Sequence, residues 1–205
     1  MGSHDDDERE RRRQQIIEGA LVVFAAKGFE KATNQEIAQA AGIGSPGLIY
    51  HYFESKADLL RQAMSSRAPL LQSVVRSDSL LSMTPREALT LIGSAFLDAL
   101  NNPDNLRLFR VIIGEALRDP SVAAAWHSAS SLPVKRGLVH YLEAKMQAGE
   151  LRRANPVAAA NCFLGSILLY VLSSELFGPT DAPRLDPDTM LVTAVEVFLQ
   201  GLEEV

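Results

Sequence analysis

Residues 28–59 read GFEKATNQEIAQAAGIGSPGLIYHYFESKADL, and this stretch decides the fold. The spacing of its apolar residues predicts two short helices, at residues 34–41 and 46–53, joined by a turn rich in glycine. Thr33 is followed three residues later by Glu36, which is the pattern of a capping box at the start of a helix. Two short helices with such a turn are typical of a helix-turn-helix, whose second helix enters the major groove of DNA.

The second predicted helix has an apolar side and a polar side. We expect Leu48 or Ile49, together with Phe53, to face the protein interior. The side chains left for the DNA side are small or form hydrogen bonds: Ser45, Gly47, Tyr50, His51 and Tyr52. Phosphate contacts are expected from Thr33 at a helix N-terminus, from the two tyrosine hydroxyls and from Lys56.

An arginine-rich segment precedes the first strong helical pattern, which spans residues 14–27. Arg9 and the arginines at 11–13 could reach DNA phosphates or a minor groove. Acidic residues at 5–8 and 10 favour the alternative, a disordered arm whose charges neutralise one another. We interpret residues 1–4 as a cloning remnant, and residues 1–13 as that remnant plus a charged arm.

The rest of the chain also reads as helix, so the predicted fold class is all-α. An N-terminal three-helix helix-turn-helix DNA-binding domain is expected at residues 14–65, and a larger C-terminal helical ligand-binding and dimerisation domain at residues 66–205. Residues 121–149 form one long helix or two that meet near residues 132–133. Residues 154–174 carry no charge, but their asparagines and serines favour a buried core or interface helix over a membrane span.

The order of residues in this region resembles the DNA-binding domain of TetR-family transcriptional regulators. The match covers about residues 14–64 and rests on Gly28, Phe29, Ala32, Thr33, Ile37, Ala38, Ala41, Gly42, Ile43, Tyr50, His51, Tyr52, Phe53, Ser55, Lys56 and Leu59. The resemblance implies a homodimeric repressor whose C-terminal helices bind a small molecule that releases the DNA operator. It also implies roles for single residues: Thr33, Lys56, Tyr50 and Tyr52 on phosphates, Gln35 on a base, and His51 on a base or the DNA backbone.

One departure from the family pattern concerns the turn. Seven residues separate Gly42 from Tyr50, one more than in the commonest form of the pattern. If the extra residue lies in the turn, the phase of the second helix is preserved. If it lies in the helix, the residues before Tyr50 rotate by about 100°, which changes where Ser45, Pro46 and Gly47 point.

The C-terminal region offers a candidate pocket and a candidate interface. Polar groups on a mostly apolar lining suit a small-molecule effector site, and the residues proposed for it are Phe96, Phe109, Arg110, Trp126 and Tyr170. The last two predicted helices have more apolar surface than one bundle face uses, which predicts a homodimer through four packed helices. The single cysteine, Cys162, is expected to be a buried thiol.

Other classes of protein find little support in the sequence. The net charge of −5 excludes a chain coated in positive charge, and one cysteine excludes an internal disulfide. Residues 42–47 match G-x-G-x-x-G, but no strand surrounds them as a nucleotide site requires. We therefore expect no enzyme, catalytic residue, cofactor or metal, no membrane partner and a cytoplasmic location. A helical small-molecule-binding protein without DNA binding remains the alternative.

Overall fold

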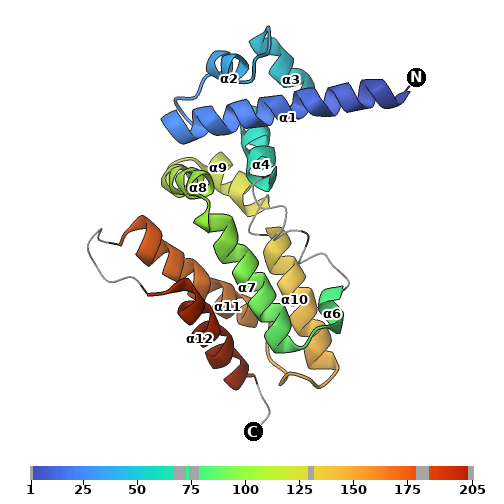
Figure 1. Cartoon of the computed structure of the whole chain (residues 1–205), viewed down its shortest axis with the longest axis vertical. Helices are drawn as coiled ribbons and strands as arrows, with labels where there is room; N and C mark the ends of the chain where they lie inside the picture. The colour runs from blue at the N-terminus through green and yellow to red at the C-terminus, as the bar shows by residue number, and fades with distance from the viewer. Residues whose placement is uncertain (1, 67–72, 74–78, 129–131, 179–184, 203–205) are drawn as a thin grey trace. The chain divides into compact units, whose positions relative to one another are not determined.

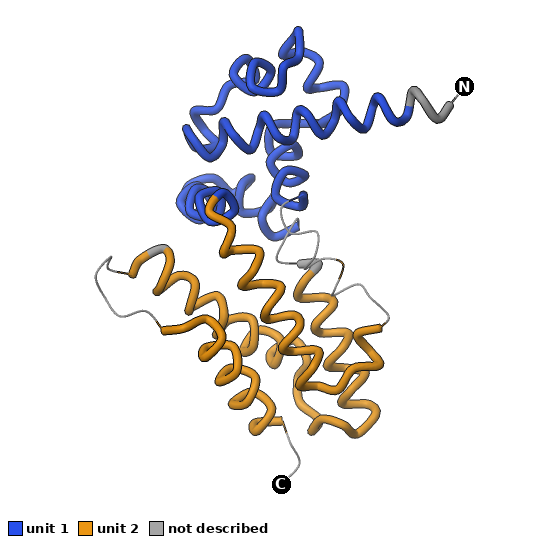
Figure 2. The backbone as a smooth tube through the Cα atoms, in the orientation of Figure 1, with its two compact units in different colours: residues 1–67, 104–130 blue, residues 68–103, 131–205 orange. Residues whose placement is uncertain are grey.

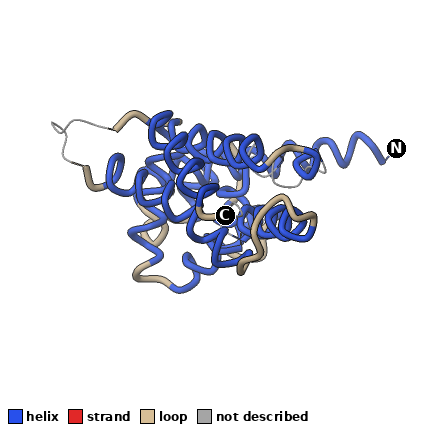
Figure 3. The backbone as a smooth tube through the Cα atoms, turned by 90° about the horizontal axis from the view of Figure 1, so that it is seen from below, coloured by secondary structure: helices blue, strands red, loops and turns tan. Residues whose placement is uncertain are grey.

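The computed structural model describes residues 2–66, 73, 79–128, 132–178 and 185–202, and within these ranges every regular element is a helix (Figure 3). The elements follow one another along the chain, and Figure 1 labels the α-helices among them: α1 (Gly2–Lys27), α2 (Asn34–Ala40), η1 (Pro46–Leu48), α3 (Ile49–Tyr52), α4 (Lys56–Ser66), α6 (Ser79–Ser82), α7 (Pro85–Asn101), α8 (Pro103–Ala116), α9 (Pro120–Trp126), α10 (Leu132–Gln147), α11 (Pro156–Val171), η3 (Leu172–Leu176) and α12 (Pro187–Gln200). The all-α class is therefore confirmed.

Several helices begin where a side chain caps their free N–H groups. Thr33 and Thr84 each accept a hydrogen bond from the backbone three residues on and complete a capping box with a glutamate. Asn155 and Asp186 cap α11 and α12, and each is followed by a proline. Proline is tolerated at the first helical position because the N–H it lacks would have no partner within the helix. These local signals explain why most predicted helix starts agree with the structure.

One helical segment differs from the expectation, and an open alternative is decided for another. α1 begins at Gly2 rather than at residue 14. Within its added part, the exposed glutamate–arginine pairs Glu8–Arg11 and Glu10–Arg13, three residues apart, favour the helix over residues 8–13. The arm is thus helical rather than disordered. Of the two alternatives for residues 121–149, the structure has two helices: α9 ends at Trp126, and α10 begins at Leu132, next to the predicted break.

The chain divides into two compact units, coloured separately in Figure 2: residues 1–67 with 104–130, and residues 68–103 with 131–205. In unit 1 the core is formed by apolar side chains of α1–α4 and of α8 and α9, including Phe24, Ile37, Leu60, Leu108 and Ile112. The helix-turn-helix therefore shares its core with two helices that follow it much later in the sequence.

In unit 2, helix α11 packs against α10 and α12, and α12 also packs against α7. Tyr141 of α10 is fully buried and donates a hydrogen bond from its hydroxyl to the Met83 carbonyl at 3.0 Å. By length and composition alone, Pro156–Glu175 is apolar enough to cross a membrane, and one third of this helical run is buried within the protein.

Candidate nucleic-acid interface

The predicted second helix of the helix-turn-helix has an irregular start. Residues 46–48 form a 3₁₀ turn, and the α-helical part is confined to residues 49–52. Ser45 caps the 3₁₀ turn, and its hydroxyl accepts a hydrogen bond from the Gly47 N–H at 3.3 Å. A 3₁₀ turn advances about 20° more per residue than an α-helix, so Ser45, Pro46 and Gly47 are placed by this turn and not by a continuous α-helix.

This helix separates buried from exposed side chains as expected, except at Tyr52, which was predicted on the DNA side but packs against the core. Ile49 and Phe53 are 1% and 2% exposed and anchor the helix in the core of unit 1. Tyr50 is 58% exposed and His51 is also exposed, while Tyr52 is half-buried and packs against the same core. The sequence therefore predicted the inward side of the helix correctly, and the outward side presents Ser45, Gly47, Tyr50 and His51 to solvent.

The first turn of α2 is held by a network around Glu36. Its carboxylate accepts hydrogen bonds from the Thr33 N–H and hydroxyl at 3.1 and 3.0 Å, and it pairs with Lys27 at the end of α1. The bond from Lys27, followed by those from Thr33, lowers the pKa of Glu36 to about 2. Thr33 is thus already committed to the cap, whereas its neighbour Gln35 is exposed on the same turn.

The ammonium of Lys56 points into its own unit. It donates hydrogen bonds to the carbonyls of Glu30 at 3.1 Å and Ala32 at 2.8 Å, and it lies 4.7 Å from the centre of the Phe29 ring. Burial lowers the pKa of Lys56, against the opposing effect of three carboxylates: Glu30, Asp119 and Glu115. Lys56 therefore fixes the loop before α2, a role that the sequence pattern did not predict.

Two further contacts were missed because they join residues far apart in sequence. Arg13 donates a hydrogen bond to the Gln62 side chain and lies 5.9 Å from the centre of the Phe53 ring. Asn34, the first residue of α2, donates from its amide nitrogen to the Tyr50 hydroxyl at 2.7 Å. No local pattern identifies either pair, since each depends on how the helices pack.

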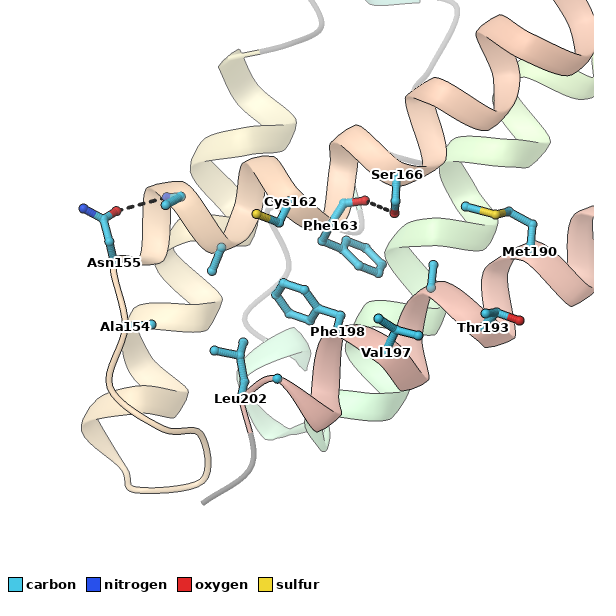
Figure 4. Close-up of a pocket in the computed structure, with 14 residues that line it drawn as sticks. Ala154, Asn155, Cys162, Phe163, Ser166, Met190, Thr193, Val197, Phe198 and Leu202 are labelled. Atoms are coloured by element: carbon cyan, nitrogen blue, oxygen red, sulfur yellow. Dashed lines mark hydrogen bonds between the residues drawn. The ribbon is translucent and has the colours of Figure 1, made fainter. Parts of the chain in front are cut away.

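A second candidate surface lies on α11 and α12, where a hollow of about 520 Å³ opens between the two helices. Figure 4 shows the rings of Phe163 and Phe198 facing each other within it, with centroids 5.4 Å apart. Large apolar side chains of these two helices stay exposed: Val197, which lines the hollow, at 63%, and Leu169, which does not line it, at 65%. Cys162 lines the hollow and is exposed, so the expectation of a buried thiol was wrong because this face of α11 is not covered by its own chain.

The five candidate effector residues lie in both units and line none of this hollow. In unit 1, Phe109 packs on Trp126 with ring centroids 5.4 Å apart, and Arg110 is exposed. In unit 2, Phe96 is half-buried, and Tyr170 donates a hydrogen bond from its hydroxyl to the Leu185 carbonyl at 2.9 Å. Within the described residues, no group of three or more histidine, cysteine or acidic side chains could hold a metal.

Two family models match the chain on either side of residue 65. Residues 16–63 match the model of bacterial regulatory proteins of the tetR family, and residues 87–201 match the C-terminal domain of AefR-like transcriptional repressors. The chain is 30% identical to the HTH-type transcriptional repressor Rv1474c of Mycobacterium tuberculosis over 188 residues, which cover 90% of this chain and 92% of that protein.

Other relatives are similar over different spans. The HTH-type transcriptional activator FasR of Mycolicibacterium smegmatis is 26% identical over 96% of this chain and 85% of its own length. The HTH-type transcriptional regulator SrpR of Pseudomonas putida is 32% identical over 54% of this chain, and that match spans only about half, 49%, of SrpR.

Solved structures share the fold. The flavonoid-responsive regulator FrrA superposes with a TM-score of 0.73 at 24% identity, covering 95% of this chain and 98% of that one. The transcriptional regulator FadR from Bacillus subtilis, solved in complex with stearoyl-CoA, gives a TM-score of 0.71 at 22% identity, covering 93% and 99%.

Proposed function

Because the chain belongs to the TetR family of bacterial transcriptional regulators, we propose that it is a dimeric repressor released from a palindromic operator by a small molecule. One observation carries the proposal: the second helix of the helix-turn-helix buries Ile49 and Phe53 and exposes Tyr50 and His51. A helix anchored on one side and polar on the other suits insertion into a major groove. Repression is favoured over activation by the AefR-like repressor model that matches residues 87–201 and by the repressor relative, which is 30% identical whereas the activator relative is 26% identical.

The proposed contacts fall into two groups. Gln35 of α2, with Ser45, Pro46, Gly47 and His51 of the second helix, would reach bases or the adjacent backbone. Thr33, Tyr50, Tyr52 and Lys56 would touch phosphates, which supply affinity without sequence information. In this proposal the arm arginines that remain exposed add attraction to DNA.

The exposed apolar face of α11 and α12 supports a homodimer. A twofold interface uses the same patch on both partners, so two helices from each chain would cover Leu169, Val197 and Cys162 together. Two recognition helices then enter successive major grooves when they lie about 34 Å apart. A regulator that binds chromosomal DNA acts where that DNA is, so in this proposal the protein works in the cytoplasm.

In this proposal, the effector releases the DNA because it binds two arrangements of the dimer with different affinities. A ligand that binds better to an arrangement with a different spacing shifts the population away from DNA, by no more than its preference between the two states. Phe109, Arg110 and Trp126 in unit 1 and Phe96 and Tyr170 in unit 2 remain the residues proposed for effector contact.

Selection from random DNA duplexes, followed by anisotropy titration of the enriched sequence, tests the proposal. We expect an inverted repeat to be enriched, with affinity that falls steeply as salt rises. His51→Ala should change the preference among operator variants, whereas Glu143→Ala, an exposed change on α10, should not. Failure to enrich any duplex would favour the helical small-molecule binder without DNA binding.

Lys56 needs a separate measurement because its ammonium also serves its own unit. If it touches a phosphate, Lys56→Ala lowers the slope of log affinity against log salt by about one. An unchanged slope together with a lower melting temperature would assign Lys56 to the fold alone.

A further inference from the structure

The exposed face of the helix-turn-helix contains one side-chain hydrogen bond between its two helices. Asn34 opens α2, Tyr50 lies in α3, and the Asn34 Nδ2 donates to the Tyr50 Oη at 2.7 Å. Asn34 is half-buried, whereas Tyr50 is 58% exposed. The bond therefore holds the tip of an otherwise solvent-exposed ring.

The direction of this bond determines whether the Tyr50 hydroxyl can still donate a hydrogen bond to another group. A tyrosine oxygen both donates one hydrogen and accepts. Because Asn34 supplies the hydrogen in this pair, the O–H hydrogen of Tyr50 is not used in the bond and stays available for an acceptor outside the protein. A phosphate oxygen is such an acceptor, and hydrogen bonds from O–H to an anion are short and strong.

We propose that Asn34 is a positioning residue for DNA binding, which fixes the Tyr50 side chain and directs its O–H hydrogen towards a DNA phosphate. The inference rests on the proposed function and deepens it by assigning one donor and the residue that orients it. Holding the ring before DNA arrives removes part of the ordering cost of binding. Asn34 itself is not required to touch the DNA.

The alternative is that Asn34 only stabilises the start of α2. The adjoining cap is independent of Asn34, since it is made by Thr33 and Glu36. A structural role would weaken DNA binding whether or not the Tyr50 hydroxyl is present. If Asn34 acts only by positioning the Tyr50 hydroxyl, changing Asn34 has no effect on DNA binding once that hydroxyl is removed. The two roles can therefore be distinguished.

A double-mutant cycle on the full chain, read by anisotropy with the selected operator duplex, tests the proposal. Asn34→Ala should weaken binding between about two- and tenfold, and Tyr50→Phe should weaken it at least as much. In the Tyr50→Phe background, Asn34→Ala should cause no further loss. Gln39→Ala, an exposed change at the other end of α2, serves as the matched control and should leave affinity unchanged.

Asn34→Asp reverses the bond at almost constant shape. A carboxylate only accepts, so the Tyr50 O–H hydrogen would turn towards residue 34 and away from DNA. The added negative charge also repels phosphate, and its cost is measured alone in the Tyr50→Phe background. We expect Asn34→Asp to weaken binding more in the presence of the hydroxyl than in its absence.

Each outcome decides between the claims. Equal losses from Asn34→Ala in both backgrounds, or no loss in either, would overturn the positioning role while leaving the DNA-binding function intact. Absence of DNA binding by the unaltered protein would overturn the proposed function and the inference with it. Melting temperatures of the variants identify any loss that comes from unfolding.

Discussion

The helix-turn-helix and the α11–α12 pair differ in how far their large apolar side chains are exposed to solvent. In unit 1, Ile16, Phe24, Ile37 and Phe53 are at most 2% exposed, and the outward side of α3 is polar. On α11 and α12, large apolar side chains such as Leu169 and Val197 stay open to solvent, and the two helices also line a hollow (Figure 4). The first surface is complete within one chain and suits a polar partner, whereas the second is of the kind that binds protein.

The largest expected effect is a loss of stability in unit 1, whose core is complete within one chain. Phe53→Ala should lower the free energy of unfolding of unit 1 by about 3–5 kcal/mol, because it removes a fully buried ring and leaves a cavity. Urea unfolding followed by circular dichroism measures the loss. His51→Ala, two residues away and exposed, should change stability by no more than about 0.5 kcal/mol. Equal effects of the two changes would contradict the assigned orientation of the helix.

The next prediction concerns the surface that is open in one chain. Val197→Asp should raise the dissociation constant of the dimer by about 30-fold or more, since it places a charge in an apolar interface. Analytical ultracentrifugation over a range of concentrations reads the change. The matched control is Val22→Asp on α1, which is equally exposed but lies outside this face. A dimer unaffected by Val197→Asp would locate the interface elsewhere.

A smaller effect is expected at the end of α1. Gly28 has φ of +81°, and an added Cβ would lie 2.8 Å from the Glu115 Oε1. Gly28→Ala should cost about 1–2 kcal/mol of stability, mostly from the left-handed backbone, because the carboxylate can move aside. Gly114→Ala, in α8 with open space around it, should instead stabilise by up to about 1 kcal/mol. Thermal melts that shifted in the same direction would refute this reading.

The smallest expected effect is a dependence on pH. The pKa of Glu36 is about 2 in the folded protein and 4.5 as its ordinary value, so its contribution to stability is present above pH 4.5. That contribution is lost as the pH falls from 4.5 towards 2, when the carboxylate is protonated. Glu36→Gln should make the free energy of unfolding depend less on pH between 4.5 and 2. A slope that Glu36→Gln leaves unchanged would contradict the assigned network.

Local chemistry explains what the sequence predicted and what it did not. The cap at Thr33 and the inward side of α3 depend on neighbours within a few residues, so pattern alone identified them. The contact of Lys56 with the carbonyls of Glu30 and Ala32 depends on helix packing. The same holds for Asn34 and Tyr50, which are sixteen residues apart. The 3₁₀ start of the second helix was missed because a Gly-Ser-Pro-Gly run permits several turn geometries.

The shared core of unit 1 limits how this regulator can be recombined with others. Leu108, Ile112 and Val122 come from α8 and α9 yet belong to the same hydrophobic cluster as the helix-turn-helix. A chimaera joined after residue 67 would lack these side chains, and the apolar residues of the helix-turn-helix domain that pack against them would be exposed to solvent. The DNA-binding unit that can be transferred is therefore discontinuous in sequence: it comprises residues 1–67 and 104–130. Chimaeras that contain both segments should keep the hydrophobic core of this unit intact.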